Sequence, residues 1–219
     1  MSAKNQISET LKSHLYYFES QGVKALRAPN IVPFIPPSRQ DAGQSPADKN
    51  MFTSQDTLFR YSLDSEKTIP HYIGFYEDPF CHSTTTFPHL PFIITSLSLV
   101  LELRGGVHGF NATVHGGLTC AIIDEAMGTL LYQNDLLNRE AKARGLIPPD
   151  AKGFSAAGTA RMDVKYRRPI QTPQTVVVTA TLDRVENRKM LMRVVLRDKD
   201  GQECATCDGM FMSFPKGKI

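Results

Sequence analysis

Residues 111–128, NATVHGGLTCAIIDEAMG, place a histidine and two glycines before an apolar stretch that contains two adjacent acids, Asp124 and Glu125. The apolar residues between positions 117 and 131 cover most of a helix circumference, which predicts a helix buried on nearly all sides. A carboxylate in such a helix costs free energy unless something pairs with it or uses it. The two acids are therefore candidates for catalysis, or for pairing with Arg or Lys at a subunit interface.

The neighbours at helical spacing distinguish the two acids, which face directions about 100° apart around a helix. Asp124 has mostly small neighbours, which leave room for a ligand or for another backbone. These neighbours are Gly117, Cys120, Ala121, Met127 and Gly128. The neighbours of Glu125 are bulkier and closer to ordinary packing. We therefore expect Asp124 to be the working acid, and we take Glu125 as a candidate substrate contact.

The glycine pair before the helix suits a carbonyl oxygen that gains negative charge. Glycines let a substrate approach the main chain, and the unpaired N–H groups of the first helical turn point at whatever lies there. Because the helix dipole also favours an oxyanion, Gly117 is the candidate donor and Gly116 a candidate substrate contact. His115 is a candidate base, or it bonds local backbone and fixes the turn. A glycine turn into a tightly packed helix is the alternative for the pair.

The elements around this helix predict an α+β fold in which the helix lies on an antiparallel sheet. Residues 91–105 alternate apolar and polar side chains, as a half-buried strand would, with Leu97, Leu99, Leu101 and Leu103 on one face. The turn sequences ENRK and DKDG indicate that the last three strands form an antiparallel meander. The predicted helix covers residues 116–133, and the later strands cover 157–167, 175–185, 190–198 and 203–214.

The N-terminal part differs in composition from the rest of the chain. Residues 1–20 have helical apolar spacing, and residues 28–50 carry five of the fourteen prolines, which predicts an extended tether over the surface. A capped helix is expected to begin within 51–63, and IPHYIGFYEDP (69–79) is typical of a strand. We therefore divide the chain into an N-terminal extension, 1–69, and a main domain, 70–219.

Composition excludes several classes of protein. The net charge of +3 is small for 219 residues and the charges are interspersed, which argues against a nucleic-acid partner. Cys204 and Cys207 are spaced C-x-x-C, but no second pair supports zinc, so we expect no metal. No apolar run reaches the roughly 18 residues of a membrane-spanning helix, and the N-terminus is a poor secretory signal. We expect a protein without a membrane span, cytoplasmic by default, with a mitochondrial location as the alternative.

The segments HGGLTCAIIDEAMG and GTARMDVKYRRPI together resemble the hotdog-fold acyl-CoA thioesterases of the PaaI-like branch, over about residues 70–214. In that family HGG opens the central helix and an acid follows nine residues after the His, as Asp124 follows His115 here. The resemblance implies that a sheet wraps the helix and that two subunits join their sheets edge to edge. It also implies a homodimer or dimer of dimers with each active site across the subunit interface.

The resemblance assigns a role to each matching residue. The Gly117 amide would polarise the thioester carbonyl, and the Asp124 carboxylate would act as nucleophile or as base on water. Thr159 matches a Ser or Thr that the partner's strand contributes to position that water. Asn111 corresponds to an Asn near HGG, although it lies four residues before His115 where several relatives have six.

The basic segment KYRRP points to a phosphate-bearing substrate. Lys165, Arg167 and Arg168 lie at the end of a predicted strand, and arginines suit bidentate recognition of phosphate. The resemblance implies that basic residues near this segment contact the CoA nucleotide; a solvated strand end is the alternative. We therefore expect hydrolysis of an acyl-CoA or acyl-carrier thioester, with no cofactor beyond the CoA of the substrate. The rival is a non-catalytic acyl-CoA or acyl-group binding protein whose extension covers the pocket or docks a partner.

Overall fold

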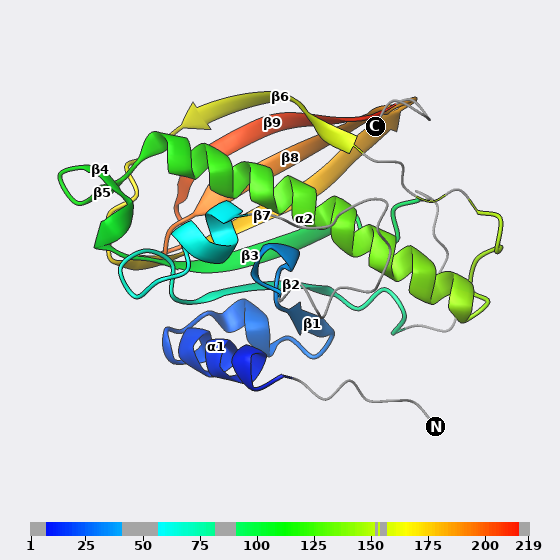
Figure 1. Ribbon diagram of the computed structural model, residues 1–219, viewed down its shortest axis with the longest axis horizontal. Helices are drawn as coiled ribbons and strands as arrows, with labels where there is room; N and C mark the ends of the chain where they lie inside the picture. The colour runs from blue at the N-terminus through cyan, green and yellow to red at the C-terminus, as the bar shows by residue number, and fades with distance from the viewer. Residues whose placement is uncertain (1–7, 41–56, 82–90, 152, 154–156, 215–219) are drawn as a thin grey trace.

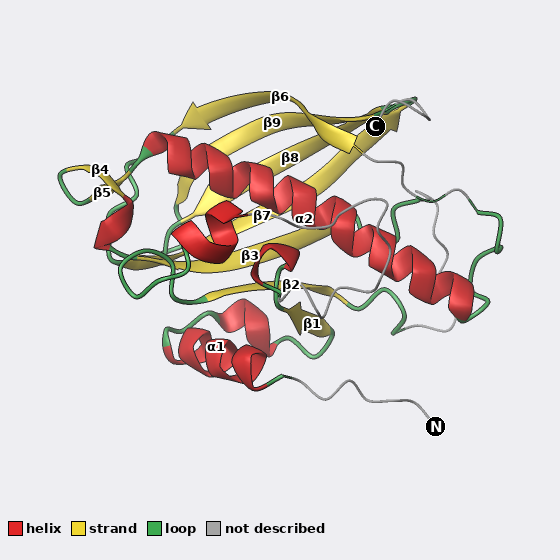
Figure 2. Cartoon of the chain, viewed as in Figure 1, coloured by secondary structure: helices red, strands yellow, loops and turns green. Residues whose placement is uncertain are grey.

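The structure, a computed structural model, describes residues 8–40, 57–81, 91–151, 153 and 157–214 of the chain. A long helix, α2 (Gly116–Ala143), lies across one face of an antiparallel sheet (Figures 1 and 2). A shorter helix, α1 (Glu9–Ser20), lies near the N-terminus. The strands are β1 (Ile31–Phe34), β2 (Tyr72–Glu77), β3 (Ser96–Leu103), β6 (Ala157–Tyr166), β7 (Gln174–Glu186), β8 (Lys189–Arg197) and β9 (Glu203–Ser213), with a separate hairpin of β4 (His108–Phe110) and β5 (Thr113–Val114). Short helical turns cover Lys24–Arg27, Pro37–Arg39, Leu58–Ser62 and Gly105–Val107.

The order of strands in the sheet is β1-β2-β3-β7-β8-β9-β6, and every neighbouring pair is antiparallel. The predicted meander is confirmed, because β7, β8 and β9 pair in sequence. Strand β6 precedes them in the chain but pairs with β9, so it forms one edge of the sheet. Its other side has no strand partner among the described residues.

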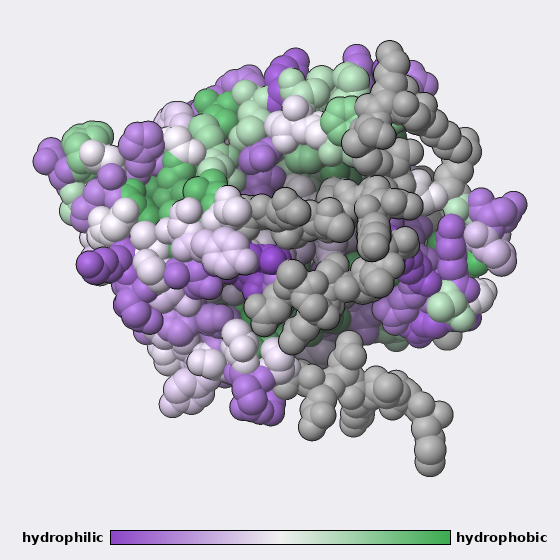
Figure 3. Space-filling view, viewed as in Figure 1, coloured by the Kyte–Doolittle hydropathy of each residue, from purple (hydrophilic) through white to green (hydrophobic). Residues whose placement is uncertain are grey.

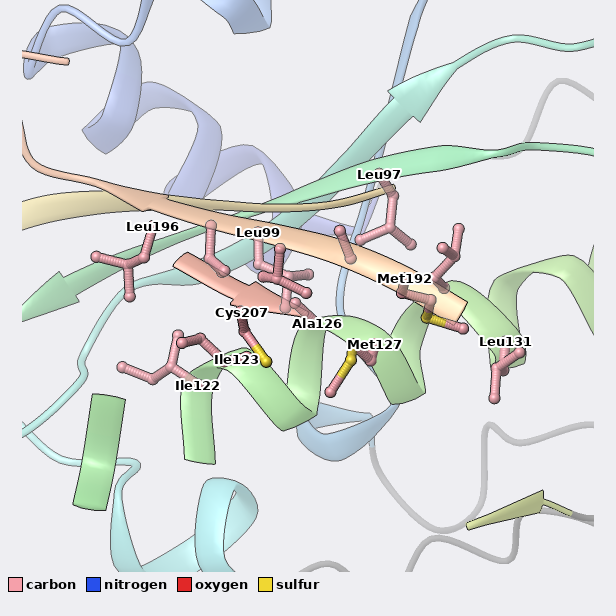
Figure 4. Close-up of a cluster of buried hydrophobic side chains, with 14 of the residues drawn as sticks. Leu97, Leu99, Ile122, Ile123, Ala126, Met127, Leu131, Met192, Leu196 and Cys207 are labelled. Carbon is pink, nitrogen blue, oxygen red and sulfur yellow. The ribbon is translucent and has the colours of Figure 1, made fainter. Parts of the chain in front are cut away.

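The main core lies between α2 and the sheet, as Figure 4 shows. Every second residue of each strand points at the helix, because successive side chains on a strand alternate between the two faces. From the sheet these include Leu97, Leu99, Met192, Leu196 and Cys207, and from the helix Ile122, Ile123, Ala126, Met127 and Leu131. This arrangement of one long helix wrapped by an antiparallel sheet is the hotdog fold that the sequence predicted.

Helix α2 is longer than predicted, since it ends at Ala143 and not near residue 133. The second half contains Asn134 and Asn138, which the apolar pattern could not place inside. Asn134 is fully buried and bonds four backbone groups: its Oδ1 accepts from the amides of Ile93 and Ile94 at 2.7 and 2.9 Å. Its Nδ2 donates to the carbonyls of Ile94 and Leu130, both at 2.9 Å. These bonds fix the approach to β3 against the helix.

The N-terminal segment is part of the fold, which corrects the predicted surface tether. Strand β1 lies within residues 28–50 and pairs with β2, with Ile31 opposite Glu77 and Phe34 opposite Gly74. The predicted helix over 1–20 is confirmed from Glu9 onwards, and residues 1–7 lie outside the described residues. The predicted start of a helix at 51–56 also lies outside them. Prolines are tolerated in an edge strand, which explains why a Pro-rich segment joins the sheet here.

Helix α1 covers the face of the sheet opposite to α2. Its buried residues, Leu11 and Phe18, pack with Ile73, Phe75 and Val100, whose strand neighbours point toward α2. Strand β3 is therefore buried on both faces over Val100–Leu103, and not half-buried as the alternation predicted. The buried Glu102 carboxylate is paired with Arg104 at 2.8 Å, which offsets the cost of its burial.

Among the helices of the described residues, none is long and apolar enough to cross a membrane.

The buried amide of Asn134 should contribute strongly to stability. We expect Asn134→Leu, which keeps a similar volume, to lower the free energy of unfolding by about 2–4 kcal/mol, because two buried backbone N–H groups lose their acceptor. Urea unfolding measures this change. The matched control is Thr129→Val on the same helix, since the buried Thr129 hydroxyl has no hydrogen-bond partner within the described chain. Equal destabilisation by the two substitutions would contradict the role of the Asn134 bonds.

Candidate functional site

Asp124 and Thr159 form a hydrogen-bonded pair on the flank of α2. The Thr159 hydroxyl donates to Asp124 Oδ1 at 2.5 Å. Thr159 lies on edge strand β6, where a bulge between Thr159 and Arg161 shifts the register against β9. A bulge re-aims the side chains of its strand, and here Thr159 points at the helix. The pair forms within one chain, which corrects the expectation that Thr159 of a partner subunit faces Asp124.

The HGG turn is held by the histidine side chain. His115 is the N-cap of α2, and its Nδ1 accepts a hydrogen bond from the Gly117 amide at 2.9 Å. A neutral imidazole whose Nδ1 accepts carries its proton on Nε2. A Cβ at position 117 would lie 3.0 Å from His115 Nδ1, so a larger residue there would make the imidazole shift slightly. The sequence left open whether His115 bonds the local backbone and fixes the turn. The structure shows that it does, and its Nε2 remains able to donate a hydrogen bond.

Asp124 and Gly117 are separated along one helix. Seven residues at a rise of 1.5 Å each place them about 10 Å apart along the axis of α2. Groups that act together on one carbonyl must each approach it to about 3–3.5 Å. Within a single chain, this axial separation works against the Gly117 amide and the Asp124 carboxylate reaching the same carbonyl.

Tyr166 is a contact of the site that the sequence analysis did not select. Its hydroxyl donates to the carbonyl oxygen of Gly116 at 2.9 Å and lies 3.0 Å from Cys120 Sγ. A phenol keeps its proton at neutral pH. The signal was present in the sequence, since Tyr166 lies at an even spacing from Val164, whose side chain faces the helix.

A cavity of about 380 Å³ lies beside the HGG turn. Gly116, Thr119 and Tyr166 line it together with Arg167 and Arg168. The strand ends here because the amides of both arginines donate to the carbonyl of Cys204, at 2.8 and 3.1 Å. Among the described residues, neither guanidinium forms an ion pair with a carboxylate. The structure thus brings two of the three predicted cations to the cavity.

Lys165 lies on the opposite face of the sheet. Its Nζ is 3.7 Å from a carboxylate oxygen of both Asp163 and Asp208. The Arg193 guanidinium also contacts Asp208 and lowers the pKa of that carboxyl. Lys165 is therefore part of an ionic cluster on the outer face, and the structure does not bring it to the cavity. Alternation along a strand explains why Lys165 and Tyr166 point in opposite directions.

Asn111 occupies the turn of the β4–β5 hairpin. Its φ is 44° and that of Ala112 is 54°, which is backbone conformation that Asn tolerates better than most residues. Asn111 is exposed, and the structure gives its side chain no contact with the other candidate residues described. Turn geometry accounts for Asn111, and its carried-over role in substrate binding gains no support.

Glu125 connects α2 to the N-terminal segment. Its Oε1 accepts from the hydroxyls of Ser38 at 2.5 Å and Tyr72 at 3.0 Å. Burial and the nearby Glu125 raise the pKa of Tyr72 well above its usual value, so this phenol stays a donor. Glu125 is held by these two hydroxyls, and its selection as a substrate contact stays a prediction. Ser38 lies 87 residues from Glu125 in the chain, and the sequence pattern gave no signal for this contact.

Hydrophobic surface gathers beside the Asp124–Thr159 pair. Figure 3 shows apolar residues over the first half of α2 and the adjacent sheet edge. The partly exposed residues there include Leu118, Ala121, Met162 and Val164. Asp124 is itself only partly buried. A carboxylate at the rim of an apolar surface becomes desolvated when a second surface covers it.

Within the described ranges, no three His, Cys, Asp or Glu side chains gather in a way that could hold a metal ion. A second cavity, of about 400 Å³, lies at the ends of β2 and β3 and contains none of the candidate residues.

Comparisons with known proteins match this region of the chain. A family model described as the thioesterase superfamily matches residues 111–205, which include the HGG turn, α2 and β6. Verlamelin biosynthesis protein B from Lecanicillium sp is 31% identical over 171 residues, which cover 71% of this chain and 71% of that protein. Acyl-coenzyme A thioesterase THEM4 from Rattus norvegicus is 26% identical over 104 residues, 47% of this chain and 36% of that protein.

Solved structures with a similar arrangement include the PaaI protein of the E. coli phenylacetic acid degradation operon, with a TM-score of 0.44 and 12% identity over 55% of this chain and 73% of that one. A Streptococcus mutans protein bound to acetyl CoA has a TM-score of 0.45 and 13% identity, over 57% of this chain and 85% of that one. The sequence matches carry the assignment. The chain belongs to the thioesterase superfamily and is a thioester hydrolase.

Proposed function

We propose that the protein hydrolyses an acyl-CoA thioester to a carboxylic acid and CoA, with Asp124 as the reacting group. The observation that carries this proposal is the Asp124–Thr159 hydrogen bond at the rim of an apolar surface. Thr159 engages Oδ1, which orients the carboxylate. Only an ionised carboxylate can attack a carbonyl or take a proton from water.

Two routes use the same geometry. In the first, Asp124 removes a proton from water, and the hydroxide adds to the thioester carbonyl; collapse of the tetrahedral intermediate expels the CoA thiolate. In the second, Asp124 itself adds to the carbonyl, expels the thiolate and forms a mixed anhydride, which water then hydrolyses. In both, the oxygen of the carbonyl gains negative charge, and an amide at the start of α2 stabilises it.

The active unit in this proposal is a homodimer. Because Gly117 and Asp124 of one chain lie about 10 Å apart along the helix, we assign the amide that faces each Asp124 to a second copy. Strand β6 offers the surface for this copy: it is a ten-residue edge strand with apolar neighbours. An unpaired edge of this length favours pairing with another strand. Two-fold pairing of β6 with its copy would bring each HGG turn toward the other chain's Asp124.

Arg167 and Arg168 are the proposed contacts for the phosphates of CoA. They line the cavity beside the HGG turn, and their guanidinium groups are not consumed by carboxylates among the described residues. A phosphate group there would receive charge-assisted hydrogen bonds. The pantetheine arm would then run past Tyr166 and Gly116 toward the reacting carbonyl.

Substitution of the pair tests the chemistry. We expect Asp124→Asn to lower kcat by about 10²–10⁴-fold, because an amide can neither attack nor accept the proton. Thr159→Ala should lower kcat less, by about tenfold, and Thr159→Ser should retain most of it. Release of free thiol from a panel of acyl-CoA substrates measures these rates. The control is Asp163→Asn on the outer face of β6. If the wild type binds CoA but releases no thiol from any substrate, the protein is a binding protein and the proposal is overturned.

Mixed dimers test which groups come from which chain. Gly117→Pro removes the amide donor at a position in the first helical turn, where proline is tolerated. A purified heterodimer of Asp124→Asn with Gly117→Pro should recover about half of wild-type activity, since one of its two symmetric sites is intact. A heterodimer of Asp124→Asn with Thr159→Ala should recover little, because neither site has both groups. Equal recovery by both heterodimers would exclude the shared site.

Loss of the arginine contacts should affect the nucleotide end of the substrate. We expect Arg167→Ala and Arg168→Ala to raise KM for acyl-CoA by about tenfold or more, because each removes charge-assisted bonds to phosphate. The same variants should leave KM unchanged for the matching acyl-pantetheine thioester, which has no nucleotide. Lys165→Ala, on the outer face, serves as the control. A similar rise in KM for both substrates would contradict phosphate recognition at these residues.

A further inference from the structure

Two side chains contact the peptide unit between Gly116 and Gly117, and a third contacts one of them. Tyr166 donates to the Gly116 carbonyl oxygen at 2.9 Å, and the Gly117 amide donates to His115 Nδ1 at 2.9 Å. The carbonyl of Gly116 and the N–H of Gly117 belong to one planar peptide unit. The group that the proposed function uses to stabilise the oxyanion is therefore held at both of its ends. Because the amide has one hydrogen, the Gly117 N–H must be shared between His115 Nδ1 and the oxyanion, or released by His115, when it acts.

The protons in this cluster have one consistent arrangement. A phenol has a single O–H, and Tyr166 directs it at the Gly116 carbonyl oxygen. The 3.0 Å contact with Cys120 Sγ must then use the thiol as donor and the phenol oxygen as acceptor. The order of donation runs from the Cys120 S–H through the Tyr166 O–H to the Gly116 carbonyl, and from the Gly117 N–H to the His115 imidazole.

This series of hydrogen bonds changes how strongly the Gly117 N–H can donate. A hydrogen bond accepted by a peptide carbonyl draws electron density from the peptide nitrogen, so the N–H of the same unit becomes a better donor. Hydrogen bonds in series strengthen one another for this reason. The contact also fixes the direction of the amide, because Tyr166 is anchored on β6, a separate element, 50 residues away in the chain.

We propose that Tyr166, supported by Cys120, is a positioning residue that orients and polarises the Gly116–Gly117 peptide for the oxyanion of the reaction. This inference rests on the proposed function and adds two residues to it. Tyr166 acts through the Gly117 amide, so its contribution belongs to the transition state, in which the carbonyl oxygen is charged, more than to the bound substrate. It should therefore appear in kcat and not in KM.

Tyr166→Phe tests the role of the hydroxyl while it keeps the aromatic ring. We expect kcat to fall about fivefold to tenfold with KM for acyl-CoA unchanged, as for the loss of one neutral hydrogen bond. Cys120→Ala should lower kcat about twofold to threefold, and Cys120→Ser, which keeps a donor, should restore it. In the Tyr166→Phe background, Cys120→Ala should have no further effect, because its only route to the peptide is absent.

The amide of Gly117 gives a readout that does not depend on activity. In glycine-labelled protein, the Gly117 amide proton should move upfield in Tyr166→Phe and, by less, in Cys120→Ala, since a weaker donor is less deshielded. Gly128 and Gly201, which lie away from the cluster, are internal controls. The shift would appear even if acyl-CoA is not the substrate, so it separates this inference from the proposed function.

Three outcomes would overturn the inference. The first is an unchanged Gly117 amide signal in Tyr166→Phe. The second is a wild-type enzyme that hydrolyses acyl-CoA while Tyr166→Phe has the same kcat. The third is additive loss of kcat from Cys120→Ala and Tyr166→Phe, which would mean that the thiol acts directly and not through the phenol. A wild type without any thiol release, combined with the expected shift, would overturn the proposed function alone.

Discussion

The attachment of strand β6 to helix α2 at two points controls the geometry of the site. At one point Thr159 donates to the Asp124 carboxylate, and at the other Tyr166 donates to the carbonyl of Gly116. The bulge in β6 makes the first contact possible, since it turns Thr159 toward the helix while the rest of the strand keeps its pairing with β9. A single edge strand thus positions the proposed acid and the proposed oxyanion donor, and it also presents the edge at which a second chain would complete the site.

The N-terminal segment supports the helix from another side. Ser38 and Tyr72 hold Glu125, the residue next to Asp124, so the rotation of α2 about its axis is fixed close to the reacting carboxylate. Helix α1 covers the outer face of the sheet over β2 and β3, and the outer face near β6 and β9 carries charged residues such as Lys165 and Asp208. One part of the outer face is therefore covered by α1, and the part near β6 and β9 carries charged side chains.

Local patterns predicted the elements of this fold well, and long-range contacts account for the differences. The period of the apolar residues identified α2 and the strands, and the small neighbours of Asp124 separated it from Glu125. The second half of α2 was missed because Asn134 and Asn138 look polar in sequence, although the amide nitrogen of each donates to backbone carbonyls inside the core. Strand β1 was missed because its prolines indicate a loop, and pairing with β2 is a contact between distant segments.

In the candidate site, too, local patterns identified most residues and long-range contacts account for what the patterns missed. Residue type and spacing selected Asp124, Gly117 and His115, and the family resemblance selected Thr159. The structure shows how each of these residues is held. Nothing local showed that Thr159 meets Asp124 of its own chain, since this depends on a bulge. Alternation along β6 did contain the information that Lys165 faces away from the helix and Tyr166 toward it, and a stricter use of that rule would have selected Tyr166.

The central claim is that the reacting carbonyl lies between the Asp124 carboxylate and an amide at the start of α2. A crystal structure of the Asp124→Asn variant with an intact acyl-CoA substrate tests this claim most directly. We predict that the carbonyl carbon lies within about 3.5 Å of the side chain at 124, with its oxygen facing the Gly117 amide of the other protomer. A thioester bound away from position 124, or one whose carbonyl oxygen meets neither protomer's HGG turn, would contradict the account.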